Sequence, residues 1–132
     1  MTAVYLDSSA LVKLVVAEPE SSVLVEFLRG RSERVSSAVA LVEVPRALRR
    51  AGFGVSERRR SREVMARIAL VDVDRRILAA AAALDPPELR TLDAIHLATA
   101  LAVREDLEVL VTYDRRLAAA AEHVHLEVSA PN

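Results

Sequence analysis

The chain has 132 residues, 52% of them hydrophobic and 28% charged, and a formal net charge of -1. This length predicts one soluble domain, residues 1–132, and the lack of cysteine excludes disulfides, thiolate nucleophiles and cysteine-ligated zinc. The near-zero charge gives no overall basic field for a nucleic acid. Asp7 and Lys13 interrupt the apolar N-terminal run, which argues against a signal peptide or membrane helix. We therefore expect a cytoplasmic protein without a membrane partner.

Short apolar runs of the kind found in strands alternate with longer segments of helical periodicity. Strands are predicted at 3–6, 35–37, 70–73, 109–112 and 124–128. Helices are predicted at 10–16, 19–29, 38–51, 56–69, 75–84, 91–104 and 114–121. This alternation predicts an α/β fold with a mostly parallel sheet between helices, and ligands bind beyond the carboxyl ends of such strands.

Local signals mark some helix boundaries. Ser56 and Asp74 stand where an N-cap is expected, before a predicted helix. Pro45 lies inside a predicted helix, where it removes a backbone hydrogen bond, so we expect a kink beside Glu43.

Four of the 19 acidic residues stand in apolar surroundings. They are Asp7, Glu43, Asp93 and Asp114. An ionised carboxylate near a core is costly unless a cation or several donors compensate it. Asp7 and Asp114 directly follow apolar strands, and a parallel sheet brings both to one edge. Asp93 opens an apolar helix, and Glu43 is the only charge between positions 37 and 45.

Carboxylate oxygens without cysteine or histidine partners are the ligands that Mg2+ and Mn2+ prefer. The pattern therefore predicts metal-assisted hydrolysis of a phosphodiester, with Asp7, Asp93 and Asp114 as metal ligands and Glu43 as a fourth catalytic acid. Structural roles remain open for three of them: Asp7 and Asp114 also suit helix N-caps, and Asp93 suits a first helical turn. A mid-helix Glu43 has no capping function.

Nearly all the positive charge is arginine, and seven arginines lie between positions 46 and 62. Arginine suits phosphate as a bidentate donor, but a solvated helix face explains the run equally well. His96 lies three residues after Asp93 on the same helical face and is interpreted as a core or supporting histidine, although contact with a substrate or orientation of Asp93 remains open. His123 and His125 lack a third ligand in their pattern, which argues against zinc.

Four features resemble the PIN-domain family, and VapC-type toxins of toxin–antitoxin pairs in particular. They are YLDSSALVKL at 5–14, the isolated Glu43, LDAIHLATAL at 92–101 and LVTYDRRL at 110–117. The resemblance implies a three-layer α/β/α domain and an Mg2+- or Mn2+-dependent endoribonuclease restrained by a VapB-like antitoxin. We expect a homodimer within such a complex.

Residue by residue, the family's acidic quartet falls on the same four acids. The resemblance also assigns Ser9 and Thr112 to the hydroxyls that orient a carboxylate or a water, although ordinary capping explains both equally. Arg115 is a candidate for RNA contact at the rim of the site.

Two alternatives remain. A PIN nuclease of RNA processing, rather than a toxin, has the same motifs. A receiver-like phospho-signalling domain has a similar architecture but requires a lysine after its fifth strand, whereas Lys13 is the only lysine here. A dehalogenase-type phosphatase requires an aspartate where Ser9 stands.

Overall fold

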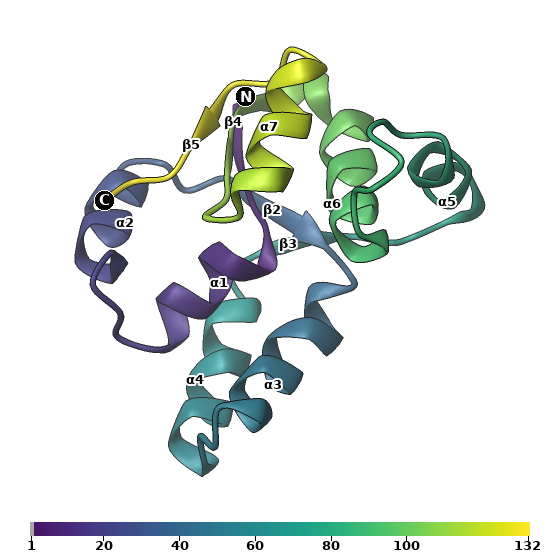
Figure 1. The fold of residues 1–132 in the computed structure, drawn as a ribbon. Coiled ribbons are helices and arrows are strands. Elements are labelled where there is room, and N and C mark those ends of the chain that lie inside the picture. Colours follow the sequence, from purple (N-terminus) through teal and green to yellow (C-terminus); the bar gives the residue numbers. More distant parts are fainter. Residues whose placement is uncertain (1) are drawn as a thin grey trace.

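The structure is a computed structural model that describes residues 2–132. Its centre is a sheet of five parallel strands in the order β3-β2-β1-β4-β5 (Figure 1). The strands are β1 (Ala3–Leu6), β2 (Arg34–Ser37), β3 (Ala69–Val71), β4 (Leu107–Val111) and β5 (Val128–Ser129). The predicted parallel α/β architecture is confirmed.

Helices cover both faces of the sheet. They are α1 (Ser8–Val15), α2 (Ser21–Leu28), α3 (Ala40–Arg50), α4 (Val55–Met65), α5 (Arg75–Ala82), α6 (Thr91–Ala102) and α7 (Arg115–His123), with a 3-10 turn at Arg104–Asp106. Helices α1 to α4 share one core with the sheet, and α6 and α7 share the other. Among the described residues, no helix is long and apolar enough to cross a membrane.

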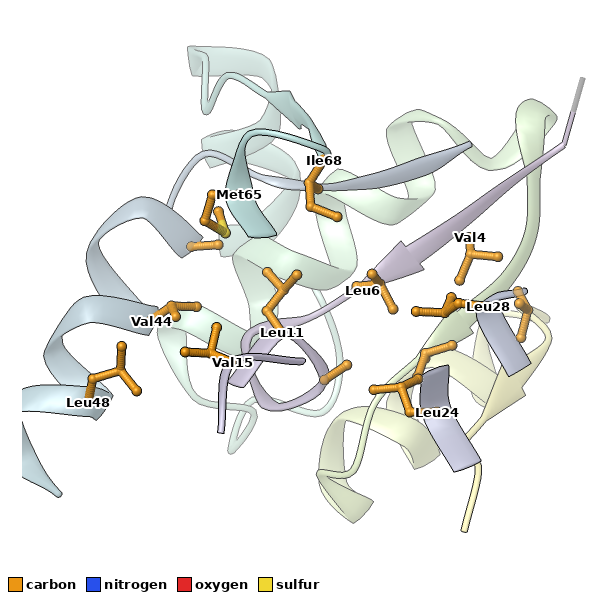
Figure 2. Packing of buried hydrophobic residues seen from close by; sticks show 14 residues of the cluster. Val4, Leu6, Leu11, Val15, Leu24, Leu28, Val44, Leu48, Met65 and Ile68 are labelled. Carbon is orange, nitrogen blue, oxygen red and sulfur yellow. The ribbon is translucent and has the colours of Figure 1, made fainter. Parts of the chain in front are cut away.

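Alternation along the strands separates these two cores. Val4 and Leu6 of β1 pack toward α1 to α4, whereas Tyr5 between them packs toward α6 and α7. The side chains of the first core are mainly aliphatic, and they are buried and packed against one another (Figure 2). Tight packing on both faces leaves the carboxyl ends of the strands as the place where polar side chains gather.

The strand order creates a switch point at β1. The chain moves outward from β1 to β2 and β3, then returns to the opposite side of β1 to form β4 and β5. Crevices in open α/β sheets form at such reversals, beyond the carboxyl ends of the two strands involved. Here those strands are β1, which leads into Asp7, and β4, which leads into Thr112 and Asp114.

Several predicted boundaries differ from the structure. Helix α3 begins at Ala40, so Glu43 lies in its first turn rather than its middle, and the helix continues through Pro45. The prediction that Ser56 caps α4 is wrong, because the helix begins at Val55 and the Glu57 side chain accepts from the Gly54 backbone N–H at 3.0 Å. Strand β5 has only two residues.

Candidate active site

Asp7 is buried and held by three donors. Its Oδ1 accepts from the Ser9 hydroxyl at 2.6 Å and from the Ala10 backbone N–H at 3.0 Å, and its Oδ2 accepts from the Thr112 hydroxyl at 2.5 Å. The Ala10 contact makes Asp7 the N-cap of α1. Burial raises the pKa of Asp7, although the hydrogen bonds from Ser9 and Thr112 oppose this shift. Asp7 therefore combines the capping role with a position beside the switch point.

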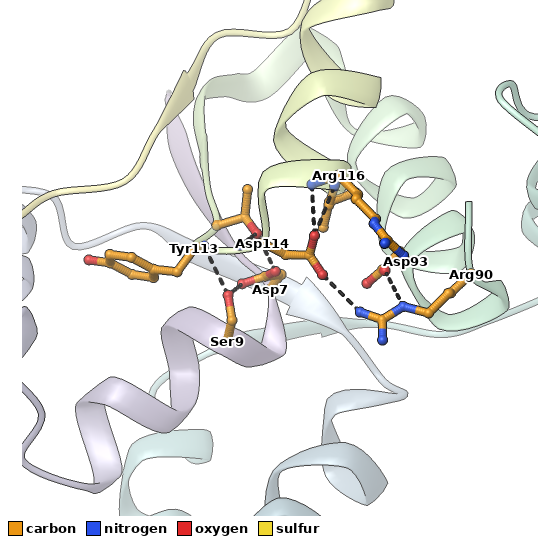
Figure 3. Close-up of polar contacts among 9 residues, drawn as sticks. Asp7, Ser9, Arg90, Asp93, Tyr113, Asp114 and Arg116 are labelled. Carbon is orange, nitrogen blue, oxygen red and sulfur yellow. Dashed lines mark hydrogen bonds and ion pairs between the residues drawn. The ribbon is translucent and has the colours of Figure 1, made fainter. Parts of the chain in front are cut away.

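Thr112 joins Asp7 to the next acid. While it donates to Asp7, its oxygen accepts from the Asp114 backbone N–H at 3.0 Å (Figure 3 shows this end of the sheet). The Ser9 hydroxyl has a similar double role, because it also accepts from the Tyr113 backbone N–H at 3.0 Å. Two hydroxyls thus clamp the turn after β4 to the turn after β1.

The two carboxylate oxygens of Asp114 have different contacts, one with the backbone of α7 and one with Arg90. Its Oδ1 accepts from the backbone N–H groups of Arg116 and Leu117, which caps α7. Its Oδ2 accepts from Nη2 of Arg90 at 2.9 Å. The capping alternative is therefore correct for Asp114, yet it leaves one carboxylate oxygen directed into the site.

Asp93 lies in the first turn of α6 and meets the same arginine. Its Oδ2 accepts from Nε of Arg90 at 3.3 Å, so one guanidinium connects Asp93 and Asp114 (Figure 3). Burial and the charge of Asp114 raise the pKa of Asp93, and Arg90 opposes this shift. The two acids are close enough to repel each other, and a cation between them reduces that repulsion.

Glu43 is held by a second polar network on the other side of the site. Its Oε1 accepts from the Ser8 hydroxyl at 2.6 Å and lies 2.7 Å from Nε2 of His96. The buried Tyr5 hydroxyl lies 2.8 Å from Nδ1 of the same imidazole. Burial works to raise the pKa of Glu43, but the hydrogen bonds from His96 and Ser8 prevail and lower it. Glu43 is therefore held as a carboxylate.

His96 connects two residues that are far apart in the chain. An ionised Glu43 only accepts, so Nε2 of His96 donates to it, and Nδ1 on the other side of the ring pairs with the Tyr5 hydroxyl. His96 is thus a buried residue that orients an acid, but that acid is Glu43 of α3 and not the preceding Asp93.

The site's oxygen ligands suit a hard divalent cation, and Arg90 already shows that the space between Asp93 and Asp114 accepts positive charge. As they stand, however, no three or more acidic or histidine side chains in residues 2–132 are gathered closely enough to hold a metal ion. The carboxylate oxygens of Asp93 and Asp114 are donors of the type that Mg2+ or Mn2+ would bind, and the Arg90 guanidinium lies between them.

An open groove of about 330 Å³ extends from this site along α3. Its lining residues are Ser8, Ser9, Val12, Val42, Glu43, Arg46, Ala47, Arg50 and Leu92. Glu43 therefore lies on the wall of a groove large enough for part of an extended ligand.

Sequence reasoning missed Arg90, Tyr5 and Ser8 as members of the site. Arg90 precedes Asp93 by three residues, a spacing that favours contact on a helix, so this signal was readable. The pairing of Tyr5 and Ser8 with His96 and Glu43 joins residues far apart in the chain, and nothing in the local pattern indicates it. Arg115 adjoins Asp114 in a separate hollow next to the site.

Comparisons with known proteins agree with this fold. The family model of the PIN domain matches residues 4–123. Over 132 residues, all of both chains, the sequence is 52% identical to Ribonuclease VapC46 of Mycobacterium tuberculosis. Two solved structures share the fold: a toxin–antitoxin complex from Klebsiella pneumoniae (TM-score 0.73, 22% identity, 98% of both chains) and VapC20 of Mycobacterium tuberculosis, described as a Sarcin-Ricin loop cleaving toxin (TM-score 0.69, 16% identity, 89% of this chain and 94% of that one).

Proposed function

Because the chain belongs to the PIN-domain family, we propose that it is an endoribonuclease that requires Mg2+ or Mn2+ and acts as the toxin of a toxin–antitoxin pair. The observation that carries this proposal is the position of the Asp93 and Asp114 carboxylates around the Arg90 guanidinium. They lie beside Asp7, at the switch point of the sheet. Family membership argues against the receiver-like alternative.

The four carboxylates have different proposed roles in hydrolysis. Asp93 and Asp114, with Asp7 behind them, would hold the metal ion in place of Arg90. When bound, the ion supplies Lewis-acid chemistry to a phosphodiester. Glu43 has a lowered pKa and a fixed orientation, so its carboxylate is available to accept a proton from the attacking water. Ser9 and Thr112 keep Asp7 in place through their hydroxyl groups.

The names of similar proteins support a substrate class and a partner. The name of VapC46 is that of a ribonuclease, and VapC20 is described as cleaving the Sarcin-Ricin loop, which supports RNA as the substrate. The Klebsiella pneumoniae structure is a toxin–antitoxin complex, which supports a VapB-like antitoxin as the partner. A cytoplasmic location and a homodimer within the complex complete the proposal.

The deciding experiment measures RNA cleavage by the purified protein in Mg2+, in Mn2+ and in EDTA, and identifies the ends of the products. Cleavage should require the metal and leave 5'-phosphate and 3'-hydroxyl ends, because water rather than the ribose 2'-hydroxyl is the nucleophile. Asp93→Asn and Asp114→Asn should abolish it. Cleavage in EDTA that leaves 2',3'-cyclic phosphate would contradict the mechanism.

A further inference from the structure

Three exposed arginines stand on α3 beyond Glu43. Arg46, Arg49 and Arg50 have no ion-pair partner within the part of the chain the structure describes. By contrast, Arg31 forms an ion pair with Glu108, and Arg90 forms ion pairs with Asp93 and Asp114. The positive charge of these three is therefore not neutralised by the protein.

Helical geometry places two of them on the same face as the catalytic acid. Arg46 and Arg50 follow Glu43 by three and seven residues, close to one and two turns. At a rise of about 1.5 Å per residue they lie roughly 4.5 and 10.5 Å from Glu43 along the helix axis. Both line the groove that contains Glu43, and a neighbouring hollow of about 270 Å³ is lined only by Arg46, Arg49 and Arg50.

The charge distribution on this face of α3 favours the binding of a polyanion. A site of four carboxylates repels a polyanion, and the net charge of -1 supplies no general attraction. Unneutralised guanidinium groups directly beside such a site offset the repulsion locally, and their planar donors match phosphate oxygens. Arg58 and Arg59 of α4 also lack an ion pair, but they line neither groove, so a solvated surface accounts for them. Arg115 lines a separate hollow with Asp114 on the other side of the site.

We propose that Arg46 and Arg50, flanked by Arg49, form a phosphate path along which a single RNA strand lies on α3 and leads into the acidic site at Glu43. This inference rests on the proposed ribonuclease function and adds to it the face of the molecule that binds the strand. The arginines bind successive backbone phosphates, so they contribute affinity without sequence specificity.

Salt dependence of RNA binding tests the proposal. A short fluorescent single-stranded RNA is titrated in EDTA, where no metal-dependent cleavage occurs, over about 0.05 to 0.4 M KCl. Each phosphate contact on a single strand contributes about -0.7 to the slope of log K against log salt. The double variant R46Q/R50Q should therefore reduce the slope by roughly 1.4 and weaken binding by more than about tenfold at low salt. The control R75Q/R76Q removes the same charge from exposed positions on α5 and should leave the slope unchanged.

Each other outcome is decisive. An equal loss in both double variants would mean that net charge alone governs binding, and an unchanged slope in R46Q/R50Q would mean that α3 does not bind the strand. Oligoglutamate of matched charge that displaces the RNA equally well would reassign the arginines to an acidic protein partner. Cleavage by the wild-type protein in Mn2+ is measured on the same RNA, so failure of the nuclease function is distinguished from failure of the α3 path.

Discussion

Arg90 donates through Nη2 to Oδ2 of Asp114 at 2.9 Å, and its Nε donates to Asp93 at 3.3 Å. A cation of the chain itself therefore occupies the space where the two acids converge. The side chain of Arg90 is 67% exposed, and solvent screens ion pairs this exposed, so they contribute little to stability. We therefore expect a divalent ion to be able to displace Arg90.

Arg90→Gln should bind Mn2+ several-fold more tightly than the wild-type protein, because the variant lacks the competing charge. Isothermal calorimetry of the metal-free protein measures this affinity without reference to activity. Arg75→Gln on α5 removes the same charge away from the acids and should leave the affinity unchanged. Weaker binding by Arg90→Gln would show instead that the arginine holds Asp93 and Asp114 in position for the ion.

Thr112→Val should reduce both stability and activity, because it leaves Oδ2 of Asp7 without a donor and the Asp114 N–H without an acceptor. Two buried polar groups without partners cost about 2–4 kcal/mol together. Urea unfolding and RNA cleavage measure the two effects. Thr112→Ser keeps the hydroxyl and should recover most of each. A Thr112→Val protein as stable and as active as the wild type would show that the hydroxyl has no role in the site.

Tyr5→Phe should lower kcat while leaving KM nearly unchanged. Without the Tyr5 hydroxyl, Nδ1 of His96 loses its hydrogen-bond partner, and the ring is no longer held in the orientation that donates to Glu43. The loss in stability should be about 1–2 kcal/mol. Tyr113→Phe also removes a hydroxyl, one that donates to the backbone carbonyl of Pro131, and should keep normal kcat. If Tyr5→Phe retained full kcat, the Tyr5 hydroxyl would have no part in positioning Glu43.

Metal-free stability should fall as the pH rises above the acidic range. Burial raises the folded pKa of Asp7 and Asp93 above the ordinary 3.8, so between that value and each raised pKa the folded chain holds more protons than the unfolded one. Their stabilising contribution is complete below 3.8 and is lost as pH rises through the raised values. Glu43, with a lowered pKa, acts in the opposite sense only below 4.5.

Urea unfolding in EDTA from about pH 4 to 8 measures this dependence. Asp93→Asn should flatten part of the slope, and Mn2+ should reverse it, because the ion stabilises the ionised acids. Stability that increases with pH in EDTA would contradict the assignment of raised pKa values to these two acids.

Expression of the intact chain alone should arrest bacterial growth, and the Glu43→Gln form should be tolerated because it lacks the acid that accepts a proton from water. Plating efficiency after induction measures both. Co-expression with the VapB-like antitoxin that we expect the adjacent gene to encode should restore growth, through a complex that survives purification. Harmless overexpression of the intact chain would leave the nuclease chemistry in place but remove the toxin assignment.

Much of the fold followed from local pattern. The alternation of strands and helices predicted the parallel sheet, and the position of Asp7 and Asp114 after strands predicted their common edge. Periodicity is a local property, so it was sufficient for the type of each element. Boundaries were less accurate because they depend on single contacts. At His125 the backbone has a φ of 67°, outside the extended region, and β5 therefore begins only at Val128.

The sequence by itself determined which acids stand in apolar surroundings and require compensation, and these are the four carboxylates proposed for the site. Only the tertiary structure decided how each is compensated. Asp7 and Asp114 are N-caps, and the Thr112 hydroxyl links the Asp7 carboxylate to the Asp114 backbone N–H. Arg90 joins Asp93 to Asp114, and His96 contacts both Tyr5 and Glu43. These partners are separated by up to 105 positions in the chain. Hydrogen bonds and ion pairs act over a few ångströms, so the partners are defined only once the sheet and helices have brought distant segments together.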